Sequence, residues 1–473
     1  VFVNILNPEK KLIIDNIKDY NDEQGLALDE FEISYLEKLS KKIGRALTDS
    51  EVYGFSQVNS EHCRHKIFNG KFIIDGKEKK ESLFGLIKNT SEANKIGIVS
   101  AYSDNVAFIE GPNIVQFQPQ FPDKSSFYIN KEIDSIISLK AETHNFPTTV
   151  EPYNGAATGS GGEIRDRASG GTGSIPLIGS AVYMTPYSRL DNNKPWEKNI
   201  SERIWKYQTP VDILVKASNG ASDFGNCFGQ PLIVGSLFTF EHNENNNLQS
   251  FDKVIMLAGG VGFGELSQAM KKTPKKGDII VLLGGDNYRI GMGGASVSST
   301  DTGSYNDAIE LNAVQRSNPE MQKRVTNTIR SLFEMDENPI ISIHDHGAGG
   351  HLNCFSELVE DIGGEIYLDS LPVGDPSLSY KEIIGNESQE RIGIIIKEKD
   401  YEFVKKIADR ERAPIFKVGK ITADKKFRVK DRSNHIETID LDLDSLFGDA
   451  PKKIMTDSSI ESNYMEIEYD SKL

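Results

Sequence analysis

Apolar residues recur at helical spacing near the start of the chain. Residues 28–44 place four large side chains on one helical face, namely Phe31, Tyr35, Leu36 and Leu39. Thr48, followed three residues later by Glu51, has the pattern of a capping box and predicts that a second helix starts at once. We expect this second helix to carry the segment NSEHCRH, residues 59–65, near its far end. Residues 1–78 are therefore predicted to form a small helical linker region.

From about residue 96 the pattern changes to shorter segments in which apolar and polar positions alternate. The segments IGIVSAY, NVAFIEG, IDSIISLKAE and VDILVKAS are of this kind and predict strands. Three further apolar segments, KVIMLAGGVGFG, DIIVLLGGDNYRIGMGG and NPIISIHDHGAGG, run into glycine-rich sequence that we interpret as loops after strands. Strands and helices interleave, so the expected fold class is mixed α/β or α+β.

Two further helices are predicted in the second half of the chain. Asn318 as N-cap and Pro319 in the first turn mark the start of one helix. Its apolar stripe consists of Val325, Ile329, Leu332 and Phe333. The other helix, in HLNCFSELVEDI, places Leu352, Phe355, Leu358 and Val359 on one face.

The polar segment around residues 265–278 contains proline and glycine and predicts a domain boundary. We therefore expect an α/β domain over residues 79–268, a second over residues 275–450 and a tail over residues 451–473. The sequence shows no internal repeat at the level of motifs.

Length, composition and charge narrow the class of protein. The 473 residues suffice for two to three domains, and no apolar stretch is long enough to cross a bilayer. The net charge of −16 argues against a nucleic-acid or anionic-membrane surface, so we expect a small partner. Three widely spaced cysteines form no CxxC pair, which favours a reducing, cytoplasmic location.

The two ends of the sequence are informative as well. The chain does not begin with Met, and its first residues lack the layout of a secretory signal. Its last three residues, Ser-Lys-Leu, match a peroxisomal address literally. We interpret both ends as cut points within a longer chain.

The densest chemistry lies in residues 140–173, at the end of a predicted strand. Glu142 and Asp166 are carboxylates of the kind that bind magnesium when substrate phosphates complete its shell. The compensating cations are Lys140, Arg165 and Arg167. GAATGSGG is expected to be a loop whose backbone N–H groups wrap phosphate oxygens. Together with His144, the set predicts a magnesium-nucleotide site, although the P-loop pattern GxxxxGK[ST] is absent. A solvated glycine-rich loop is the alternative.

His62 and His65 are three residues apart and are expected to share a helix face. Zinc would require two more ligands, and no CxxC or HxxxH elsewhere supplies them. Two interpretations remain open for these histidines. One is a solvated helix face, and the other is a site of proton transfer near neutral pH.

Two later segments also carry polar groups. In IHDHGAGG, residues 343–350, His344 and His346 are expected on one side of a strand and Asp345 on the other. The helix that follows would place this carboxylate beside a phosphate-attracting N-terminus. GNESQERIG offers groups for amides or hydroxyls, and its Arg391 is suited to phosphate. By themselves, both segments are also compatible with ordinary polar loops.

The motifs NSEHCRH, KAETHNFPT with GAATGSGGEIRD, GGDNYRIGMGGA, IHDHGAGG and NESQER occur in this order. Together they resemble phosphoribosylformylglycinamidine synthase of purine biosynthesis in its large, single-chain form, over about residues 28–450. The resemblance implies a two-domain unit similar to aminoimidazole ribonucleotide synthetase, preceded by the helical linker. It also implies ATP-dependent phosphorylation of the amide oxygen of formylglycinamide ribonucleotide, followed by displacement with ammonia. The family has two tandem copies of this unit, and this chain has one.

The same resemblance implies roles for individual residues. The catalytic histidines would be His62 and His144. The residues against ATP would be His65 and Lys140, and the magnesium ligands would be Glu142, Asp166 and Asp345. The substrate would be lined by Thr143, Asn145, Phe146, Arg165, Gln315, Glu387, Ser388 and Gln389.

Two departures from the family pattern matter. Phe146 stands where many members have His, which weakens the expectation of a polar contact there. Cys227, in SDFGNCFGQP, is expected in a loop that does not resemble a glutaminase nucleophile elbow. Ammonia would therefore come from a glutaminase domain elsewhere. We expect the chain to have little activity alone and to pair with the second synthetase half or with a second copy of itself.

Three alternatives remain open. The chain can be another ATP-binding synthetase of the same superfamily, such as aminoimidazole ribonucleotide synthetase or selenophosphate synthetase, although NSEHCRH argues against those two. It can be a structural half that holds nucleotide without turnover. A zinc protein is the third alternative.

Overall fold

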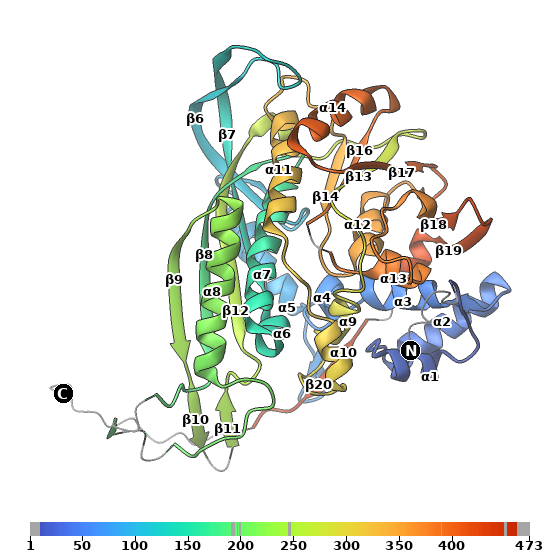
Figure 1. The fold of residues 1–473 in the computed structure, drawn as a ribbon. Coiled ribbons are helices and arrows are strands. Elements are labelled where there is room, and N and C mark those ends of the chain that lie inside the picture. Colours follow the sequence, from blue (N-terminus) through green and yellow to red (C-terminus); the bar gives the residue numbers. More distant parts are fainter. Residues whose placement is uncertain are drawn as a thin grey trace.

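The computed structural model describes residues 10–190, 194–195, 197, 200–244, 247–388, 390–448 and 452–460. Its two largest parts are a six-stranded and a seven-stranded sheet, each with helices packed against it, and the N-terminal helices lie beside the second sheet (Figure 1). The predicted mixed α/β class is therefore confirmed. No helix of the described residues is long and apolar enough to span a membrane.

The N-terminal region is helical, as the sequence predicts. Its elements are β1 (Ile13–Ile14), α1 (Ile17–Gln24), α2 (Glu30–Ile43), β2 (Leu47–Thr48), α3 (Asp49–Val58) and α4 (Glu61–Arg64). The capping box of Thr48 and Glu51 starts α3. One expectation was wrong, because α3 ends at Val58 and the segment NSEHCRH forms the separate helix α4. The hydroxyl of Ser60 accepts a hydrogen bond from the Cys63 amide at 3.2 Å and so caps a new helix.

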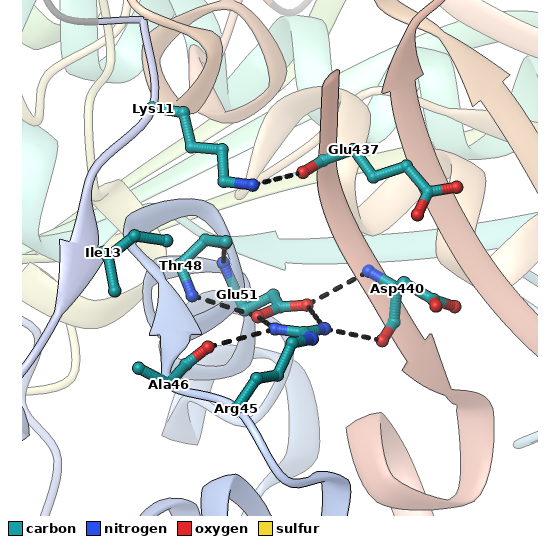
Figure 2. A pocket seen from close by; sticks show the side chains of 8 residues that line it. All are labelled: Lys11, Ile13, Arg45, Ala46, Thr48, Glu51, Glu437 and Asp440. Carbon is teal, nitrogen blue, oxygen red and sulfur yellow. Dashed lines mark hydrogen bonds and ion pairs between the residues drawn. The ribbon is translucent and has the colours of Figure 1, made fainter. Parts of the chain in front are cut away.

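These helices share a hydrophobic core with the second sheet. Leu36 and Phe55 are buried in one cluster with Leu352 and Ile439. A small cavity of about 370 Å³ lies at this junction (Figure 2). Its polar groups bond to one another, since the Arg45 guanidinium pairs with Glu51 at 2.6 Å and donates to the Asp440 carbonyl at 3.0 Å. The cavity therefore joins the helical region to the second sheet, and none of the predicted site residues lines it.

The first sheet has the order β5-β6-β7-β12-β8-β9. Its strands are β5 (Ile98–Ser100), β6 (Ala107–Pro119), β7 (Tyr128–Thr143), β8 (Ile175–Thr185), β9 (Leu232–Thr239) and β12 (Ile255–Glu265). Its helices are α6 (Asn145–Val150), α7 (Pro152–Ala168) and α8 (Pro210–Phe228), of which α7 and α8 lie side by side on one face (Figure 1). A hairpin of β10 (Glu241–Glu244) and β11 (Asn247–Ser250) follows β9.

The segment VDILVKAS was wrongly predicted to be a strand, because it lies in α8. Thr209 caps this helix, Pro210 occupies its first turn, and Ile213 and Ala217 are buried one turn apart. The eight-residue window showed apolar alternation but excluded the cap that precedes it. Cys227, expected in a loop, lies in the last turn of the same helix.

The segment GAATGSGG is not a loop, because it forms the middle of α7, where all but Gly162 are buried. Its glycines allow close packing: a Cβ on Gly155 would overlap the backbone of Pro147 and Thr148, and one on Gly161 would approach the Phe224 ring at 2.7 Å. Helical hydrogen bonds use most N–H groups of this segment, so they cannot wrap phosphate as expected.

The glycines of KVIMLAGGVGFG likewise do not form a loop but continue the strand β12 to Glu265. A Cβ on Gly260 would overlap the side chains of Arg167 and Glu163. Glycine is therefore required where α7 crosses the strand closely.

The second sheet has the order β14-β16-β13-β17-β15-β18-β19. Its strands are β13 (Ile279–Leu283), β14 (Ser342–Asp345), β15 (Gly364–Tyr367), β16 (Ile392–Ile396), β17 (Ile415–Ile421), β18 (Lys426–Asp431) and β19 (Ile436–Asp442). Its helices are α9 (Gly294–Val297), α10 (Asp307–Asn312), α11 (Pro319–Phe333), α12 (Gly350–Leu358), α13 (Tyr380–Gly385) and α14 (Tyr401–Glu411). The prediction for α11 is confirmed, and that for α12 is confirmed as far as Leu358, because Val359 follows the last residue of the helix.

Smaller elements lie between these parts. Residues 266–278 connect β12 to β13, so the polar segment links the two large sheets. The predicted domain limits themselves remain predictions. A three-stranded sheet pairs β20 (Ile454–Asp457) in parallel with β3 (Lys71–Ile74), and β4 (Lys77–Glu78) and the helix α5 (Leu83–Ala93) follow in sequence. The predicted tail thus returns to the first part of the chain.

Candidate active site

Five predicted site residues meet where β7 ends, and we call them the strand-end cluster: Lys140, Glu142, Arg165, Asp166 and Asp345. Lys140 and Glu142 are two apart on β7 and point to the same side. The Lys140 ammonium lies 2.7 Å from a carboxylate oxygen of Asp166 on α7 and 3.4 Å from one of Glu142. The structure therefore brings together residues that are separated by more than 200 positions in sequence.

Asp345 and Arg165 join the two sheets within this cluster. Both side chains are buried, and Arg165 Nε lies 3.6 Å from Asp345 Oδ2. Arg165 also donates from Nη1 to Gln322 Oε1 at 2.9 Å, and Asn105 donates to Asp345 Oδ1 at 3.0 Å. Sequence reasoning missed Gln322 and Asn105, because Gln322 lies on a helix judged by its apolar face and Asn105 in a turn.

The charges of the strand-end cluster do not balance. Burial raises the pKa of Asp166 to about 7, and the neighbouring Asp345 carboxylate adds to this effect. Burial alone would lower the pKa of Lys140, but the charges of Asp166 and Glu142 raise it above its ordinary value. Three carboxylates face two cations, so an additional positive charge is electrostatically favoured here.

His144 lies at the start of α6, immediately after β7. Its Nδ1 is 2.6 Å from the Gly155 carbonyl, which can only accept, so Nδ1 carries the proton. Burial lowers the pKa of His144 to about 4. The ring is therefore neutral near pH 7, and its Nε2 is a hydrogen-bond acceptor and a proton acceptor.

The two histidines of α4 are placed differently from the expectation of a shared helix face. Only His62 lies in α4, and His65 follows it with a left-handed backbone, φ 50°. The His65 ring meets the Phe84 ring edge-on at 5.9 Å. Desolvation lowers the pKa of His62, and the charges of Glu142 and Lys140 also act on this ring, which places it beside the strand-end cluster.

Gln315, Glu387 and Ser388 form a second group, the Glu387 cluster. The buried Glu387 carboxylate accepts hydrogen bonds from the Gly349 amide at 2.9 Å and from the Gln315 side chain. The amides of Gly294 and Ala295 also stabilise its charge, whereas burial raises its pKa to about 7. Ser388 donates to Asn386 at 3.0 Å, and Gln389 lies outside the described residues.

Four other predicted residues lie in surroundings of their own. Phe146 packs in a separate apolar cluster with Val150 and Val297, so its ring is not brought to either group. Thr143 is exposed at the end of β7, and Asn145 accepts from the Met256 amide at 3.0 Å. Arg391, considered suited to phosphate, is fully buried and uses its guanidinium within the protein.

The α4 region connects the two groups. Cys63 on α4 accepts a hydrogen bond from Asn353 Nδ2 at 2.9 Å, and Asn353 lies on α12 beside Gly349, which binds Glu387. Among the residues that the structure describes, no three His, Cys, Asp or Glu side chains form a ready metal site. The zinc interpretation thus gains no support from the geometry.

Parts of the chain match the models of known protein families. Residues 17–66 match the family model of the formylglycinamide ribonucleotide amidotransferase linker domain, and residues 275–432 match that of the C-terminal domain of AIR synthase related proteins. Over 411 residues, the chain is 39% identical to phosphoribosylformylglycinamidine synthase of Dictyostelium discoideum. The chain is related to the phosphoribosylformylglycinamidine synthases. The alignment covers 85% of this chain but only 30% of that synthase, so the chain spans less than a third of its relative.

Solved structures of Thermotoga maritima PurL have a similar fold. Thermotoga maritima PurL in complex with FGAR is 23% identical, with a TM-score of 0.60, over 93% of this chain and 58% of PurL. PurL in complex with ATP is 21% identical, with a TM-score of 0.59, over 93% of this chain and 59% of PurL. The expected synthetase-like fold with its preceding linker is therefore confirmed.

Proposed function

We propose that the chain supplies part of a site for ATP-dependent amidation of formylglycinamide ribonucleotide. The observation that carries this proposal is the strand-end cluster, which combines three carboxylates with Lys140 and Arg165 beside two histidines. The related Dictyostelium protein is a phosphoribosylformylglycinamidine synthase. Thermotoga maritima PurL has been solved in complex with FGAR and in complex with ATP. Because the chain spans a fraction of its relatives, the complete reaction requires the rest of such a protein.

Magnesium fits the excess negative charge of the cluster. Glu142, Asp166 and Asp345 would hold it, and the cation would displace the proton that Asp166 binds at its raised pKa of about 7. Because these residues form no closed set of ligands, phosphate oxygens of ATP would complete the shell. When bound, the magnesium-nucleotide supplies the phosphoryl group and offsets its charge during transfer.

The protein's own groups have distinct roles in this proposal. Lys140 and His65 contact the nucleotide, and Arg165 orients the substrate. His144 accepts a proton at Nε2, because its Nδ1 proton is held by the Gly155 carbonyl. His62, on α4 beside Glu142, approaches the reacting amide.

The proposed substrate-binding residues are those of the Glu387 cluster together with Thr143, Asn145 and Gln389. Thr143 is exposed and can reach a ligand, whereas Glu387 is already bonded to two helix N-termini. Phe146 would act only by packing. A cytoplasmic location and supply of ammonia by a separate glutaminase domain complete the proposal.

A second proposal concerns the partner of the first sheet. The face opposite α7 and α8 carries Val182, Met184, Leu257, Val234 and Phe238 at alternate positions of adjacent strands. Val234 and Phe238 are each 54% exposed. This apolar face fits the second synthetase half or a second copy of this chain.

Calorimetric titration with AMPPCP, with and without magnesium, tests the nucleotide site. We expect binding that requires magnesium and weakens at least tenfold in Asp166→Asn. The control is Asp134→Asn, an exposed carboxylate on the same strand as Lys140. Binding that is equally strong in Asp166→Asn contradicts the role of the cluster. Nucleotide binding that persists while amidation is absent in the completed enzyme would favour a structural half.

A further inference from the structure

One face of α12 holds both histidines that flank Asp345. The three side chains involved, His351, Cys354 and Glu357, are spaced three residues apart. Glu357 Oε2 accepts from His344 Nε2 at 2.5 Å, and Cys354 Sγ donates to the His344 carbonyl at 3.5 Å. One turn earlier on the helix, His351 Nδ1 lies 2.8 Å from His346 Nε2.

The direction of the hydrogen bonds through His351 is fixed by Arg391. A guanidinium only donates, and Arg391 Nη1 lies 2.8 Å from His351 Nε2, so this nitrogen accepts. An imidazole whose Nε2 accepts has its one proton on Nδ1, so the hydrogen bond between His351 Nδ1 and His346 Nε2 has a single possible direction. His351 donates from Nδ1 to His346 Nε2, and His346 keeps its own proton on Nδ1.

Arg391 is itself held by all five of its N–H groups. Nε donates to the Ser388 carbonyl, Nη1 donates to Asn287 and His351, and Nη2 donates to the carbonyl and the side chain of Asn386. No donor remains for a phosphate. The direction of the hydrogen bond from Arg391 to His351 is therefore fixed by the other partners of the guanidinium, Ser388, Asn386 and Asn287.

We infer that His351 is a positioning residue for Asp345. His346 directly follows Asp345 at the end of β14, so holding His346 against α12 fixes the backbone from which the Asp345 carboxylate reaches Arg165 and Asn105. The inference rests on the proposed function in that Asp345 would bind the magnesium-nucleotide.

Two variants of His351 in the full chain separate packing from hydrogen bonding. The His351 ring stacks on Phe355 at 5.2 Å with an angle of 5° between the planes, so His351→Phe keeps a stacked ring and loses both hydrogen bonds. In His351→Gln the amide oxygen can accept from Arg391 and the amide nitrogen can donate to His346. The measurements are nitrogen-15 NMR of the histidine rings, titration with AMPPCP and magnesium, and the thermal midpoint.

We expect His346 to carry its proton on Nδ1 in the parent chain and in His351→Gln, and to lose this preference in His351→Phe. Magnesium-dependent binding of AMPPCP should weaken about tenfold in His351→Phe and recover in His351→Gln, as for other residues that orient a ligand. Unchanged binding in a folded His351→Phe overturns the inference.

Failure of the proposed function gives a different result. If the parent chain does not bind AMPPCP, the nucleotide site is refuted for this chain, and the ring protons decide the inference. An Nδ1 proton on His346 in the parent and in His351→Gln, but not in His351→Phe, then supports the positioning role. Any other distribution of ring protons overturns it.

Discussion

The buried Glu387 side chain accepts hydrogen bonds from the N-termini of two helices. Its carboxylate accepts from Gly349, at the N-terminus of α12, and is stabilised by the amides of Gly294 and Ala295 at the N-terminus of α9. Helix N-termini present unpaired N–H groups and a partial positive charge, which a carboxylate satisfies. Burial nevertheless outweighs these contacts, and the pKa of Glu387 is raised to about 7.

This raised pKa predicts a loss of stability as pH rises. Folded Glu387 holds its proton more tightly than the unfolded chain, so its contribution is fully present below about pH 4.5 and is lost as pH rises through about 7. A shift of this size corresponds to about 3 kcal/mol. In Glu387→Gln this dependence should be absent, so between pH 5 and 8 the urea midpoint of the parent should fall relative to that of the variant.

Glu92→Gln is the matched control, because this carboxyl on α5 is 66% exposed. It should leave the pH dependence of the urea midpoint unchanged. Parallel midpoint curves for the parent and Glu387→Gln would show that Glu387 does not titrate in this range.

At the scale of single residues, the sequence predicts the charged side chains of the site better than the side chains that hydrogen-bond to them. Glu142, Asp166 and Asp345 are recognisable because carboxylates beside cations at strand ends are typical of phosphate sites. Gln322 is not recognisable, since an amide on an amphipathic helix gives no signal until the fold brings it to Arg165. Arg391 misleads for the same reason, because its five partners come from segments that only the fold assembles.

At the scale of elements, α7 shows why a glycine-rich segment can be a helix. In a sequence, glycines suggest a loop. In this fold, close contacts with α6, α8 and β12 require the small residues, and the cost of glycine in a helix is offset by packing. Capping signals predict α3 and α11 correctly, because a cap is a local interaction, whereas the close contacts of the α7 glycines are with other elements.

Two glycines of α7 should therefore respond oppositely to alanine. A Cβ on Gly155 would overlap the backbone of Pro147 and Thr148, so Gly155→Ala should destabilise the chain by about 1–3 kcal/mol or more. On Gly162 the nearest atom to a Cβ is Arg165 Nη2 at 3.6 Å, an ordinary contact. Gly162→Ala should therefore stabilise the helix by up to about 1 kcal/mol. Urea midpoints measure both effects, and equal shifts would contradict the packing argument.

At the scale of the whole molecule, the two sheets differ in how they are covered. The second sheet shares its core with the N-terminal helices, which bury Leu36 and Phe55 against it. The first sheet has α7 and α8 on one face (Figure 1), while apolar residues such as Leu257 remain accessible on the other. An accessible apolar sheet face of this kind fits the partner surface proposed above.

The proposed partner face predicts association of the chain with itself when the second half is absent. Phe238 and Leu237 are neighbours on β9, 54% and 56% exposed, and they point to opposite faces of the sheet. Phe238→Lys places a charge on the face opposite α7 and α8, whereas Leu237→Lys places it on the helix side.

In sedimentation equilibrium, Phe238→Lys should weaken dimerisation at least tenfold, because desolvating an unpaired ammonium is costly. Leu237→Lys should dimerise like the parent. Equal weakening by both variants would place the dimer interface elsewhere, and a parent that stays monomeric at high concentration would leave the second synthetase half as the partner that this face fits.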